Sequence, residues 1–338
     1  MQTLILAGGK GTRLRPLTLH TPKPIVPIVN RPFIHYQLDL LRPLNADGAM
    51  GVLLSLSYQP RRIEEALAHE ELGGIRLRSV VERQPLGTAG AMRNVRSQVT
   101  GTLLVLNGDI LTDIDLRPVL ERHRARRAAA TLVLVNVEDT RAYGVVELDD
   151  EGRIRGFYEK PESGVTSAKS INAGIYLLEP DVLDLIPEGR EYSFEYDLFP
   201  RLLTSGLPLY GEVTDAYWLD IGTPERYRQA NADVLSGRLR RYPPESSPPL
   251  TPDGSAVDAG ATLKSGVSVT RSVIGANCYL ENDVQVMDSV VLAGARIAEG
   301  ARVSSSIIGR GAHVGSNSML RNVVLGDKSV VTDFSRLG

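Results

Sequence analysis

The stretch that most constrains the fold is LILAGGKGTRLRPLT at residues 4–18, followed by PKP at residues 22–24. Its apolar start predicts a buried strand, which leads directly into a loop with glycines at positions 8, 9 and 11. Glycines let backbone N–H groups converge on an anion without side chains in the way. Arg13 adds a planar fork for phosphate oxygens, and Lys23 adds a compact point charge. The stretch therefore predicts a nucleoside triphosphate site at the carboxyl end of a first strand.

Two other phosphate-binding motifs do not fit this loop. The Walker motif requires the spacing G-x-x-x-x-G-K-[ST], which no window here supplies. The dinucleotide fingerprint G-x-G-x-x-G begins at Gly9 and Gly11 but has Leu14 where the third glycine belongs. An ordinary glycine turn would explain the three glycines alone. It does not explain the arginine, proline and lysine positions that follow them.

Length and composition indicate a soluble protein of two domains. The 338 residues exceed the usual size of a single core. A hydrophobic content of 42% and a charged content of 23% are typical of globular proteins. The net charge of −2 argues against nucleic-acid binding, and the single cysteine, Cys278, excludes an intrachain disulfide. No signal-peptide pattern or membrane-length apolar run is present, so we expect a cytoplasmic protein without membrane contact.

The first part of the chain alternates short apolar runs with amphipathic stretches. This pattern predicts an α/β domain over residues 1–239, with a Rossmann-like, largely parallel sheet. Strands are expected at 2–6, 50–57, 75–82, 101–107, 130–137, 144–148, 171–178 and 216–221, and helices at 32–44, 60–69, 88–97, 115–127, 193–204 and 224–236. Residues 240–254 are rich in proline and polar residues and predict a linker.

Residues 255–338 contain an internal repeat of 17 residues. Three columns of aliphatic residues recur at this spacing: Val257, Ile274, Val291, Ile308 and Leu325; Leu263, Leu280, Ile297, Val314 and Val331; and Val269, Val286, Val303 and Leu320. Ser272, Ser289 and Ser306 keep the same spacing. Steps of 6, 6 and 5 residues fit no helical period and predict a three-sided parallel β-helix of the hexapeptide type, with roughly four coils.

Further polar motifs follow the predicted strands, at the edge of the sheet where ligand sites collect. Glu82 begins ERQPLGTAG at residues 82–90, in which Gly87 would let a flat base approach the backbone. Asp109 ends NGD at residues 107–109, and Asp220 lies in WLDIGTP at residues 218–224. Two carboxylates on separate strand ends match the way Mg²⁺ is held beside substrate phosphates, although a lone aspartate after a strand is usually a turn former.

Three further segments offer groups for a sugar phosphate: YGVV at residues 143–146, EKP at 159–161 and NAGIY at 172–176. Glu159 can accept from sugar hydroxyls, Lys160 can neutralise a phosphate, and Asn172 offers both a donor and an acceptor. Gly144 permits a close backbone approach. Each has an ordinary structural explanation when it is taken singly, since a surface Glu-Lys pair is usually a solvated ion pair.

Taken together, these motifs resemble those of the sugar-1-phosphate nucleotidyltransferases over the whole chain, and LRPLTLHTPKP, PLGTAG and the β-helix most resemble mannose-1-phosphate guanylyltransferases. The resemblance implies condensation of a nucleoside triphosphate with a hexose 1-phosphate, a left-handed β-helix, Mg²⁺ as cofactor and a homo-oligomer. It implies these site residues: Arg13 and Lys23 on the reacting phosphates; Leu6, Ala7, Gly8, Gly9, Gly11, Thr12, Glu82 and Gly87 for the nucleotide; Gly144, Glu159, Lys160 and Asn172 for the sugar phosphate; and Asp109 and Asp220 for the metal.

Three alternatives stay open at this point. One alternative substrate pair is glucose 1-phosphate with a uridylyl, thymidylyl or adenylyl donor. The β-helix can be an acyltransferase, although its one histidine, His313, precedes an inward valine and a spacer or assembly role fits better. The chain can also be a non-catalytic regulatory homologue, against which Arg13, Lys23, Asp109 and Asp220 argue.

Overall fold

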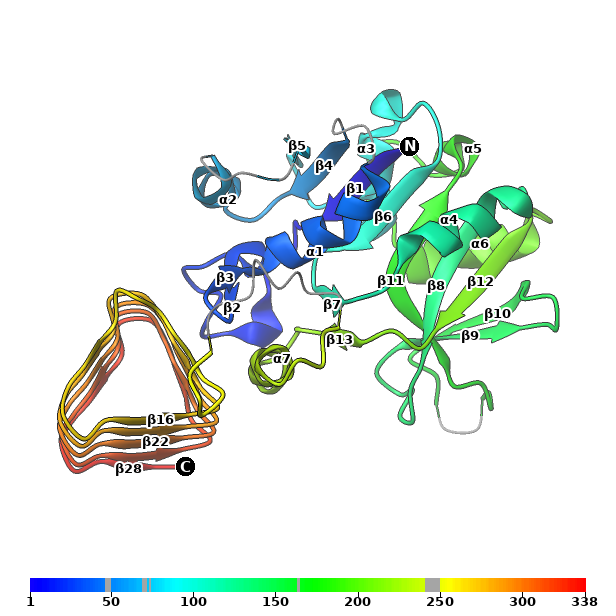
Figure 1. Cartoon of the computed structure of the whole chain (residues 1–338). Coiled ribbons are helices and arrows are strands. Elements are labelled where there is room, and N and C mark those ends of the chain that lie inside the picture. Colours follow the sequence, from blue (N-terminus) through cyan, green and yellow to red (C-terminus); the bar gives the residue numbers. More distant parts are fainter. Residues whose placement is uncertain (46–49, 69–71, 73, 163–164, 241–249) are drawn as a thin grey trace. The chain divides into compact units, whose positions relative to one another are not determined.

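A computed structural model describes residues 1–45, 50–68, 72, 74–162, 165–240 and 250–338 (Figure 1). The chain divides into two compact units. Unit 1 comprises Met1–Gly9 and Tyr36–Trp218, and unit 2 comprises Lys10–His35 and Leu219–Gly338. Unit 2 thus combines the repeat with two segments that precede it in the chain. Most of the predicted linker, residues 241–249, lies outside the described residues.

Unit 1 is built on a sheet whose main path has the order β10-β9-β11-β6-β1-β4-β5, with β8 pairing β11 and β12 (Figure 1). The strands are β1 (Gln2–Leu6), β4 (Gly51–Leu56), β5 (Arg76–Val81), β6 (Leu103–Asn107), β8 (Ala130–Asn136), β9 (Gly144–Leu148), β10 (Ile154–Glu159), β11 (Ser170–Leu178) and β12 (Leu209–Thr214). The α/β fold class is confirmed. The pairs among β6, β1, β4 and β5 are parallel, whereas β11 runs antiparallel to β6, β8 and β9, so the sheet is mixed.

The predicted strands of the first domain are all present, with 216–221 shortened to β13 (Trp218–Asp220). However, β10, β12, the short β7 (Ile110–Thr112) and the two-residue strands β2 (Pro27–Ile28) and β3 (Arg31–Pro32) were not predicted. Glycines explain the first two omissions, because Gly156 and Gly211 interrupt the apolar alternation of β10 and β12. Neighbouring side chains fill the space beside both glycines. An added Cβ would lie 2.8 Å from the Tyr158 ring at Gly156 and 2.6 Å from Leu148 at Gly211.

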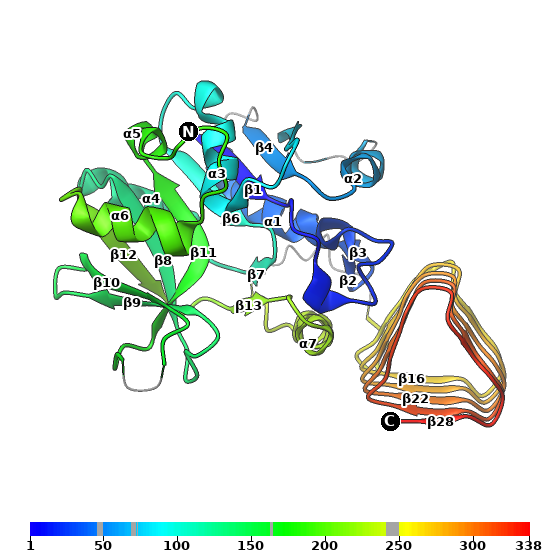
Figure 2. The ribbon, with the colours of Figure 1, turned by 180° about the vertical axis from the view of Figure 1, so that it is seen from behind.

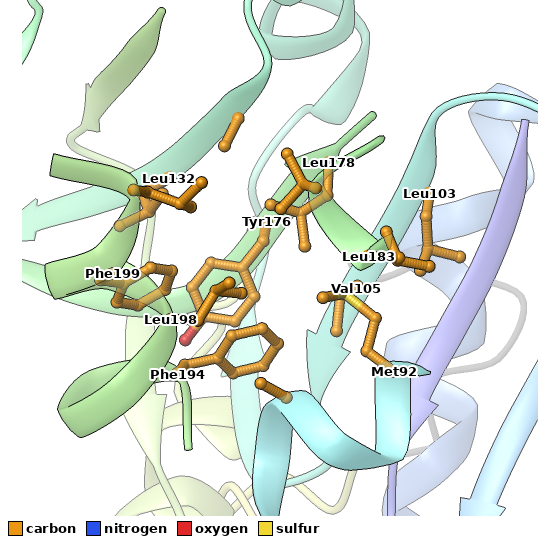
Figure 3. Packing of buried hydrophobic residues seen from close by; sticks show 14 of the residues in the cluster. Met92, Leu103, Val105, Leu132, Tyr176, Leu178, Leu183, Phe194, Leu198 and Phe199 are labelled. Carbon is orange, nitrogen blue, oxygen red and sulfur yellow. The ribbon is translucent and has the colours of Figure 1, made fainter. Parts of the chain in front are cut away.

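Helices pack on this sheet through one large apolar cluster. The helices of the chain before the repeat are α1 (Phe33–Leu41), α2 (Pro60–Leu67), α3 (Gly87–Asn94), α4 (Leu116–Ala125), α5 (Pro180–Asp184), α6 (Phe199–Thr204), which follows a π-helical turn at Phe194–Leu198, and α7 (Pro224–Leu235). Figure 3 shows Tyr176 of β11 among Phe194, Leu198 and Phe199. The Tyr176 and Phe194 ring centroids are 4.6 Å apart, so the aromatic contacts tie the 194–204 segment to the middle of the sheet. No described helix is long and apolar enough to cross a membrane.

In unit 2, residues 256–337 form a left-handed parallel β-helix with a triangular cross-section (Figures 1 and 2). Its three walls are parallel sheets of five strands each, in the orders β14-β17-β20-β23-β26, β15-β18-β21-β24-β27 and β16-β19-β22-β25-β28. The strands are β14 (Ala256–Val257), β15 (Thr262–Leu263), β16 (Ser268–Thr270), β17 (Val273–Ile274), β18 (Tyr279–Leu280), β19 (Gln285–Met287), β20 (Val290–Val291), β21 (Arg296–Ile297), β22 (Arg302–Ser304), β23 (Ile307–Ile308), β24 (His313–Val314), β25 (Met319–Arg321), β26 (Val324–Leu325), β27 (Val330–Val331) and β28 (Arg336–Leu337).

The strand register confirms the 17-residue columns. Partners such as Val257 and Ile274, or Leu280 and Ile297, lie in neighbouring coils. The side chains of the middle coils, including Ile274, Val291 and Ile308, are completely buried. The stack has five strands a wall rather than the four coils expected, because Leu337 continues the third column beyond Leu320.

The repeated serines form a buried hydrogen-bonded ladder along one corner of the β-helix. The hydroxyl of Ser272 accepts from the backbone N–H of Ser289 at 3.0 Å. The hydroxyl of Ser289 in turn accepts from the backbone N–H of Ser306, also at 3.0 Å. Ser255 begins the ladder, and Ser306 accepts from Val323 N–H at its other end. Each serine therefore satisfies a buried donor of the next coil, as burial of backbone N–H groups requires.

The two earlier segments of unit 2 pack together through a small hairpin. β2 (Pro27–Ile28) and β3 (Arg31–Pro32) are antiparallel and joined by Val29 and Asn30, whose φ angles are both positive, 46° and 63°. Helix α7 holds the hairpin, since Tyr227 Oη donates to the carbonyl of Pro27 at 2.5 Å. Asn231 Oδ1 accepts from the N–H of Val29 at 2.8 Å.

Candidate functional site

The carboxyl end of β1 carries the beginning of the glycine loop and lies beside Glu82. Ser57 Oγ donates to the carbonyl of Gly8 at 2.5 Å, and Ser55 Oγ donates to Glu82 Oε1 at 2.7 Å. An added Cβ at Gly8 would lie 3.0 Å from Ser57 Oγ and 3.4 Å from Glu82 Oε1. The structure thus brings together Gly8 and Glu82, two predicted nucleotide-binding residues that are far apart in sequence. At Gly9 an added Cβ would meet open space.

Residues 85–90 pack against the backbone of residues 190–194. The N–H groups of Ala89 and Gly90, in the first turn of α3, both donate to the carbonyl of Tyr192, at 2.9 and 3.0 Å. Gly87 has a φ of +70°, and an added Cβ would lie 2.7 Å from that same carbonyl. Packing by itself therefore requires glycine at position 87, and the contact between Gly87 and a base stays a prediction.

Asp109 follows the closest approach between β1 and the loop after β6. Gly108 donates its N–H to the carbonyl of Leu6 at 2.9 Å, and an added Cβ at Gly108 would lie only 2.3 Å from that oxygen. Asp109 is half-buried, and its charge contributes to raising the pKa of the Tyr176 phenol. This electrostatic influence places Asp109 near the polar end of β11.

Asn172 and Tyr176 define that polar end. Asn172 Nδ2 donates to Tyr176 Oη at 2.8 Å, and Asn172 Oδ1 accepts from Gly174 N–H at 3.0 Å. A register shift of β11 between Asn172 and Tyr176 accommodates Gly174, which has a φ of +74° and packs against Asn107. Complete burial raises the pKa of Tyr176 well above its usual value, so this hydroxyl stays protonated and holds the Asn172 amide in place.

Glu159 and Lys160 lie at the end of β10, next to Gly144. Lys160 Nζ is 3.2 Å from Glu159 Oε1. The other carboxylate oxygen, Glu159 Oε2, is buried and has no hydrogen-bond partner among the described residues. An added Cβ at Gly144 would lie 2.9 Å from that oxygen. Gly144, Glu159 and Lys160, all predicted to bind the sugar phosphate, are therefore neighbours.

Glu195 is a member of this cluster that the sequence did not indicate. Burial raises its pKa, the nearby Glu159 carboxylate raises it further, and Lys160 lowers it. Glu195 also raises the pKa of Tyr176, the residue to which Asn172 is hydrogen-bonded. Glu195 therefore interacts electrostatically with Glu159 and Lys160 and also with Tyr176 beside Asn172. Its only local signal is Ser193, which caps the π-helical turn by accepting from the N–H of Glu195 at 3.0 Å.

The N–H of Ala7, in unit 1, donates to the carbonyl of Ser55 at 2.9 Å. The other predicted residues belong to unit 2. Gly11 adopts the left-handed conformation, and its carbonyl accepts from Thr18 Oγ1 at 2.7 Å. Thr12 and Arg13 form the short 3-10 turn that follows, and Arg13 is exposed. Lys23 begins the next 3-10 turn and is half-buried.

Asp220 and Arg13 meet around Gly222. Asp220 Oδ1 accepts from Gly222 N–H, and Asp220 Oδ2 pairs with Arg226 Nη1, both at 2.6 Å. An added Cβ at Gly222 would lie 3.0 Å from Nη2 of Arg13. Arg226, one turn into α7, was not predicted. The only indication of Arg226 in the sequence is its position, three residues after the N-cap Thr223.

Asp109 and Asp220 have the donor chemistry that Mg²⁺ takes. Both are hard carboxylate ligands, and each Asp220 oxygen that accepts a bond keeps a further lone pair. The described residues contain no group of three or more His, Cys, Asp or Glu side chains arranged for a metal. A cation at either carboxylate would therefore need further oxygens from substrate phosphates and water, which is how Mg²⁺ is usually bound.

Two family models match parts of the chain. Residues 2–237 match the family model described as nucleotidyl transferase, and residues 252–337 match the model of the GMPPB C-terminal domain. A mannose-1-phosphate guanylyltransferase of Mycobacterium tuberculosis is 42% identical over 80% of this chain and 75% of the relative. A UTP–glucose-1-phosphate uridylyltransferase of Synechocystis is 37% identical over 71% of this chain and 65% of the relative.

Solved structures also resemble the chain. The crystal structure of HddC from Yersinia pseudotuberculosis complexed with GMP-PN has a TM-score of 0.58 and 30% identity. It covers 69% of this chain and 99% of that one.

Proposed function

Since the chain belongs to the nucleotidyl transferase family and is a nucleotidyltransferase, we propose that it condenses GTP with mannose 1-phosphate into GDP-mannose and pyrophosphate. The support for this substrate pair is the 42% identity to a mannose-1-phosphate guanylyltransferase and the match of residues 252–337 to the GMPPB C-terminal domain. A second pair, UTP with glucose 1-phosphate, is favoured by the 37% identical uridylyltransferase and is the competitor in the test below.

The observation that carries the sugar phosphate end of the proposal is the buried, unpartnered oxygen of Glu159. A buried carboxylate oxygen without a partner loses hydration, and a ligand hydroxyl restores the missing hydrogen bond. Lys160 sits on the other oxygen of the same carboxylate and supplies a cation for the phosphate. Asn172, held by Tyr176, adds an amide for a second ring hydroxyl. Gly144 lets the Glu159 carboxylate and the Phe157 ring lie directly against its backbone, because an added Cβ would be 2.9 Å from Glu159 Oε2 and 2.7 Å from Phe157.

The reaction is an in-line displacement at phosphorus. A phosphate oxygen of the hexose 1-phosphate forms a bond to the α-phosphorus of the triphosphate, and the bond between that phosphorus and the oxygen bridging to the β-phosphorus breaks. Pyrophosphate leaves with the electron pair of the broken bond. No covalent intermediate with the protein is needed, so catalysis rests on positioning and charge neutralisation.

The chain supplies these two effects from separate groups of residues. Arg13 binds the β- and γ-phosphates, where a bidentate guanidinium neutralises the leaving pyrophosphate, and Lys23 neutralises charge developing on the reacting phosphates. The proposed nucleotide-binding residues are Leu6, Ala7, Gly8, Gly9, Gly11, Thr12, Glu82 and Gly87. Glu82 is fixed for this role by Ser55 Oγ and by the N–H of Leu86 at 3.2 Å.

Asp109 and Asp220 would hold Mg²⁺. When bound, this ion screens the charge of the triphosphate and polarises its phosphorus-oxygen bonds. Arg226 orients the Asp220 carboxylate through its 2.6 Å ion pair. We further propose that the chain forms a homo-oligomer and resides in the cytoplasm. The composition of the chain and its resemblance to this family support this proposal.

The test is a pyrophosphate-release panel of nucleoside triphosphates against hexose 1-phosphates, with Mg²⁺ present. GTP with mannose 1-phosphate should give the highest kcat/KM, and omission of either substrate or of Mg²⁺ should abolish release. A higher kcat/KM for UTP with glucose 1-phosphate would replace the proposed pair by its competitor. Absence of turnover for every pair would contradict the proposed reaction.

A further inference from the structure

Unit 2 contains two groups of residues that the sequence places far apart, the segment 10–35 and the β-helix. The segment carries Arg13 and Lys23, which the proposed function assigns to the phosphates. Two contacts join it to the β-helix, one at the second coil and one at the last. These contacts indicate a role for the β-helix beyond that of a spacer or an assembly surface.

The first contact is a hydrogen bond at the tip of the β2–β3 hairpin. Asn30 Nδ2 donates to the carbonyl of Ile274 in β17 at 2.8 Å. That carbonyl already accepts the N–H of Asp258 from the preceding coil at 2.9 Å, so Asn30 uses its second lone pair. Asn30 is half-buried and Ile274 is completely buried. This bond joins the hairpin to the second coil of the β-helix. Asn30 lies seven residues after Lys23 in the sequence.

The second contact lies at the last coil, between Pro16 and Gly326. Gly275, Gly309 and Gly326 occupy the same corner of the repeat, at multiples of 17 residues. An added Cβ at Gly275 would lie 2.7 Å from Ala293 N, and one at Gly309 would lie 2.4 Å from the carbonyl carbon of Gly326, both in the following coil. No coil follows Gly326, and there the nearest atom is Cβ of Pro16, at 3.1 Å.

A side chain at position 326 would therefore crowd Pro16, a contact that the repeat itself does not make. The φ of Gly326 is not in the left-handed region, so no backbone conformation demands glycine at this position. Pro16 lies three residues after Arg13 and takes the place beside Gly326 that the next coil takes beside Gly309. The neighbouring Leu14 and Leu17 are buried, so this part of the segment is packed on both sides of Pro16.

We propose that the β-helix is the mount that positions the phosphate-binding segment 10–35, through Asn30 on Ile274 and Pro16 on Gly326. This inference rests on the proposed function for its catalytic consequence, although the contacts themselves do not depend on it. Helix α7 also supports this segment, because Tyr227 and Asn231 are hydrogen-bonded to the hairpin. Asn30, Pro16 and Gly326 are positioning residues, since they act on Arg13 and Lys23 through the backbone between them.

The variants that test the mount are Asn30→Gly and Gly326→Val in the full-length chain. Asn30→Gly removes the hydrogen bond but keeps a residue that tolerates the φ of 63°. Gly326→Val introduces a branched side chain where even Cβ would lie 3.1 Å from Pro16. Matched controls are Asn322→Gly, an exposed turn position with a φ of 55°, and Gly260→Val, whose nearest neighbours belong to the β-helix itself.

Two readouts separate the mount from the proposed reaction. The first is hydrogen exchange of peptides covering residues 10–35. It should be about fivefold faster in Asn30→Gly, as expected for loss of one hydrogen bond, faster than in the wild type in Gly326→Val through steric displacement of Pro16, and unchanged in the controls. The second is steady-state kinetics, in which KM for GTP should rise by about the same factor. KM for mannose 1-phosphate should stay unchanged, because Glu159, Lys160 and Asn172 belong to unit 1.

The outcomes are distinct. Exchange in residues 10–35 that matches the controls would overturn the mount, whether or not the protein is active. Faster exchange with an unchanged KM for GTP would overturn its catalytic role. A wild-type chain without turnover would contradict the proposed function, and the exchange experiment would still decide for or against the mount.

Discussion

The ammonium of Lys160 lies 3.2 Å from Oε1 of Glu159, although the two residues are consecutive at the end of a strand. Consecutive side chains of a strand point to opposite faces of a sheet, so this pairing needs a change in the backbone. Lys160 supplies it with a φ of 45°, a left-handed conformation that costs a non-glycine residue about 1 kcal/mol or more. Strain of this kind persists where the surroundings impose it, often at a functional site, and here it keeps an ion pair beside a buried, unpartnered oxygen.

The first prediction concerns this ion pair. Glu159→Gln should lower kcat/KM for mannose 1-phosphate about tenfold or more, since a charged hydrogen bond to the sugar is lost, while KM for GTP stays within about twofold. Lys160→Met should do the same through the phosphate. Initial rates at varied sugar phosphate and fixed, saturating GTP measure the effect. The matched control is the exposed pair of Glu138 and Lys169, 3.1 Å apart, whose substitution to Gln and Met should change neither constant. Equal effects from both pairs would remove Glu159 and Lys160 from the site.

The second prediction concerns the metal. Asp109→Asn and Asp220→Asn should each lower turnover by about two orders of magnitude and raise the Mg²⁺ concentration needed for half-maximal activity, because a neutral amide is a poorer ligand for Mg²⁺. Rates measured across a Mg²⁺ titration, with chelator treatment of the wild type as reference, test this. Asp215→Asn, an exposed position in the same part of the chain, is the control. Wild-type turnover and Mg²⁺ dependence in either variant would exclude that aspartate as a ligand.

The third prediction concerns the serine ladder of the β-helix. Ser289→Ala leaves the buried N–H of Ser306 without its acceptor and should lower the free energy of unfolding by about 1–3 kcal/mol. Thermal unfolding followed by circular dichroism measures the change. Ser268→Ala, at an exposed position of β16, should be within about 0.5 kcal/mol of the wild type. A ladder variant as stable as this control would show that the N–H of Ser306 finds another partner.

The fourth prediction concerns pH and Glu195. Burial and the neighbouring Glu159 raise the pKa of Glu195 in the folded chain, so the folded state holds its proton more tightly than the unfolded state does. The resulting stability is present below the unfolded pKa and is lost as pH rises through the folded pKa. Glu195→Gln should therefore unfold at a higher temperature than the wild type at pH 8, with a smaller difference at pH 4.5. The same gain at both pH values would indicate a packing effect instead of a titration.

The sequence by itself determined those features that repeat or alternate locally. The 17-residue columns placed each strand of the β-helix in register, because a side chain's position in the repeat decides whether it faces the interior. The apolar run of β1 and the glycines after it located the first strand and the loop, and PLGTAG located the start of α3. These inferences succeed because strand and turn formation depend on neighbours within a few residues.

Only the tertiary structure decided which distant segments meet. Nothing in the local pattern of β11 shows that it runs antiparallel to β6, since a buried apolar strand reads the same in either direction. Glu195 joins Glu159 only because the aromatic core around Tyr176 fixes the segment after residue 193. Pro16 rests on Gly326 across 310 residues of sequence, and the grouping of the phosphate-binding segment with the β-helix follows from such contacts. Contacts of this range depend on how whole surfaces pack, and that information is spread over the core instead of residing in any one stretch.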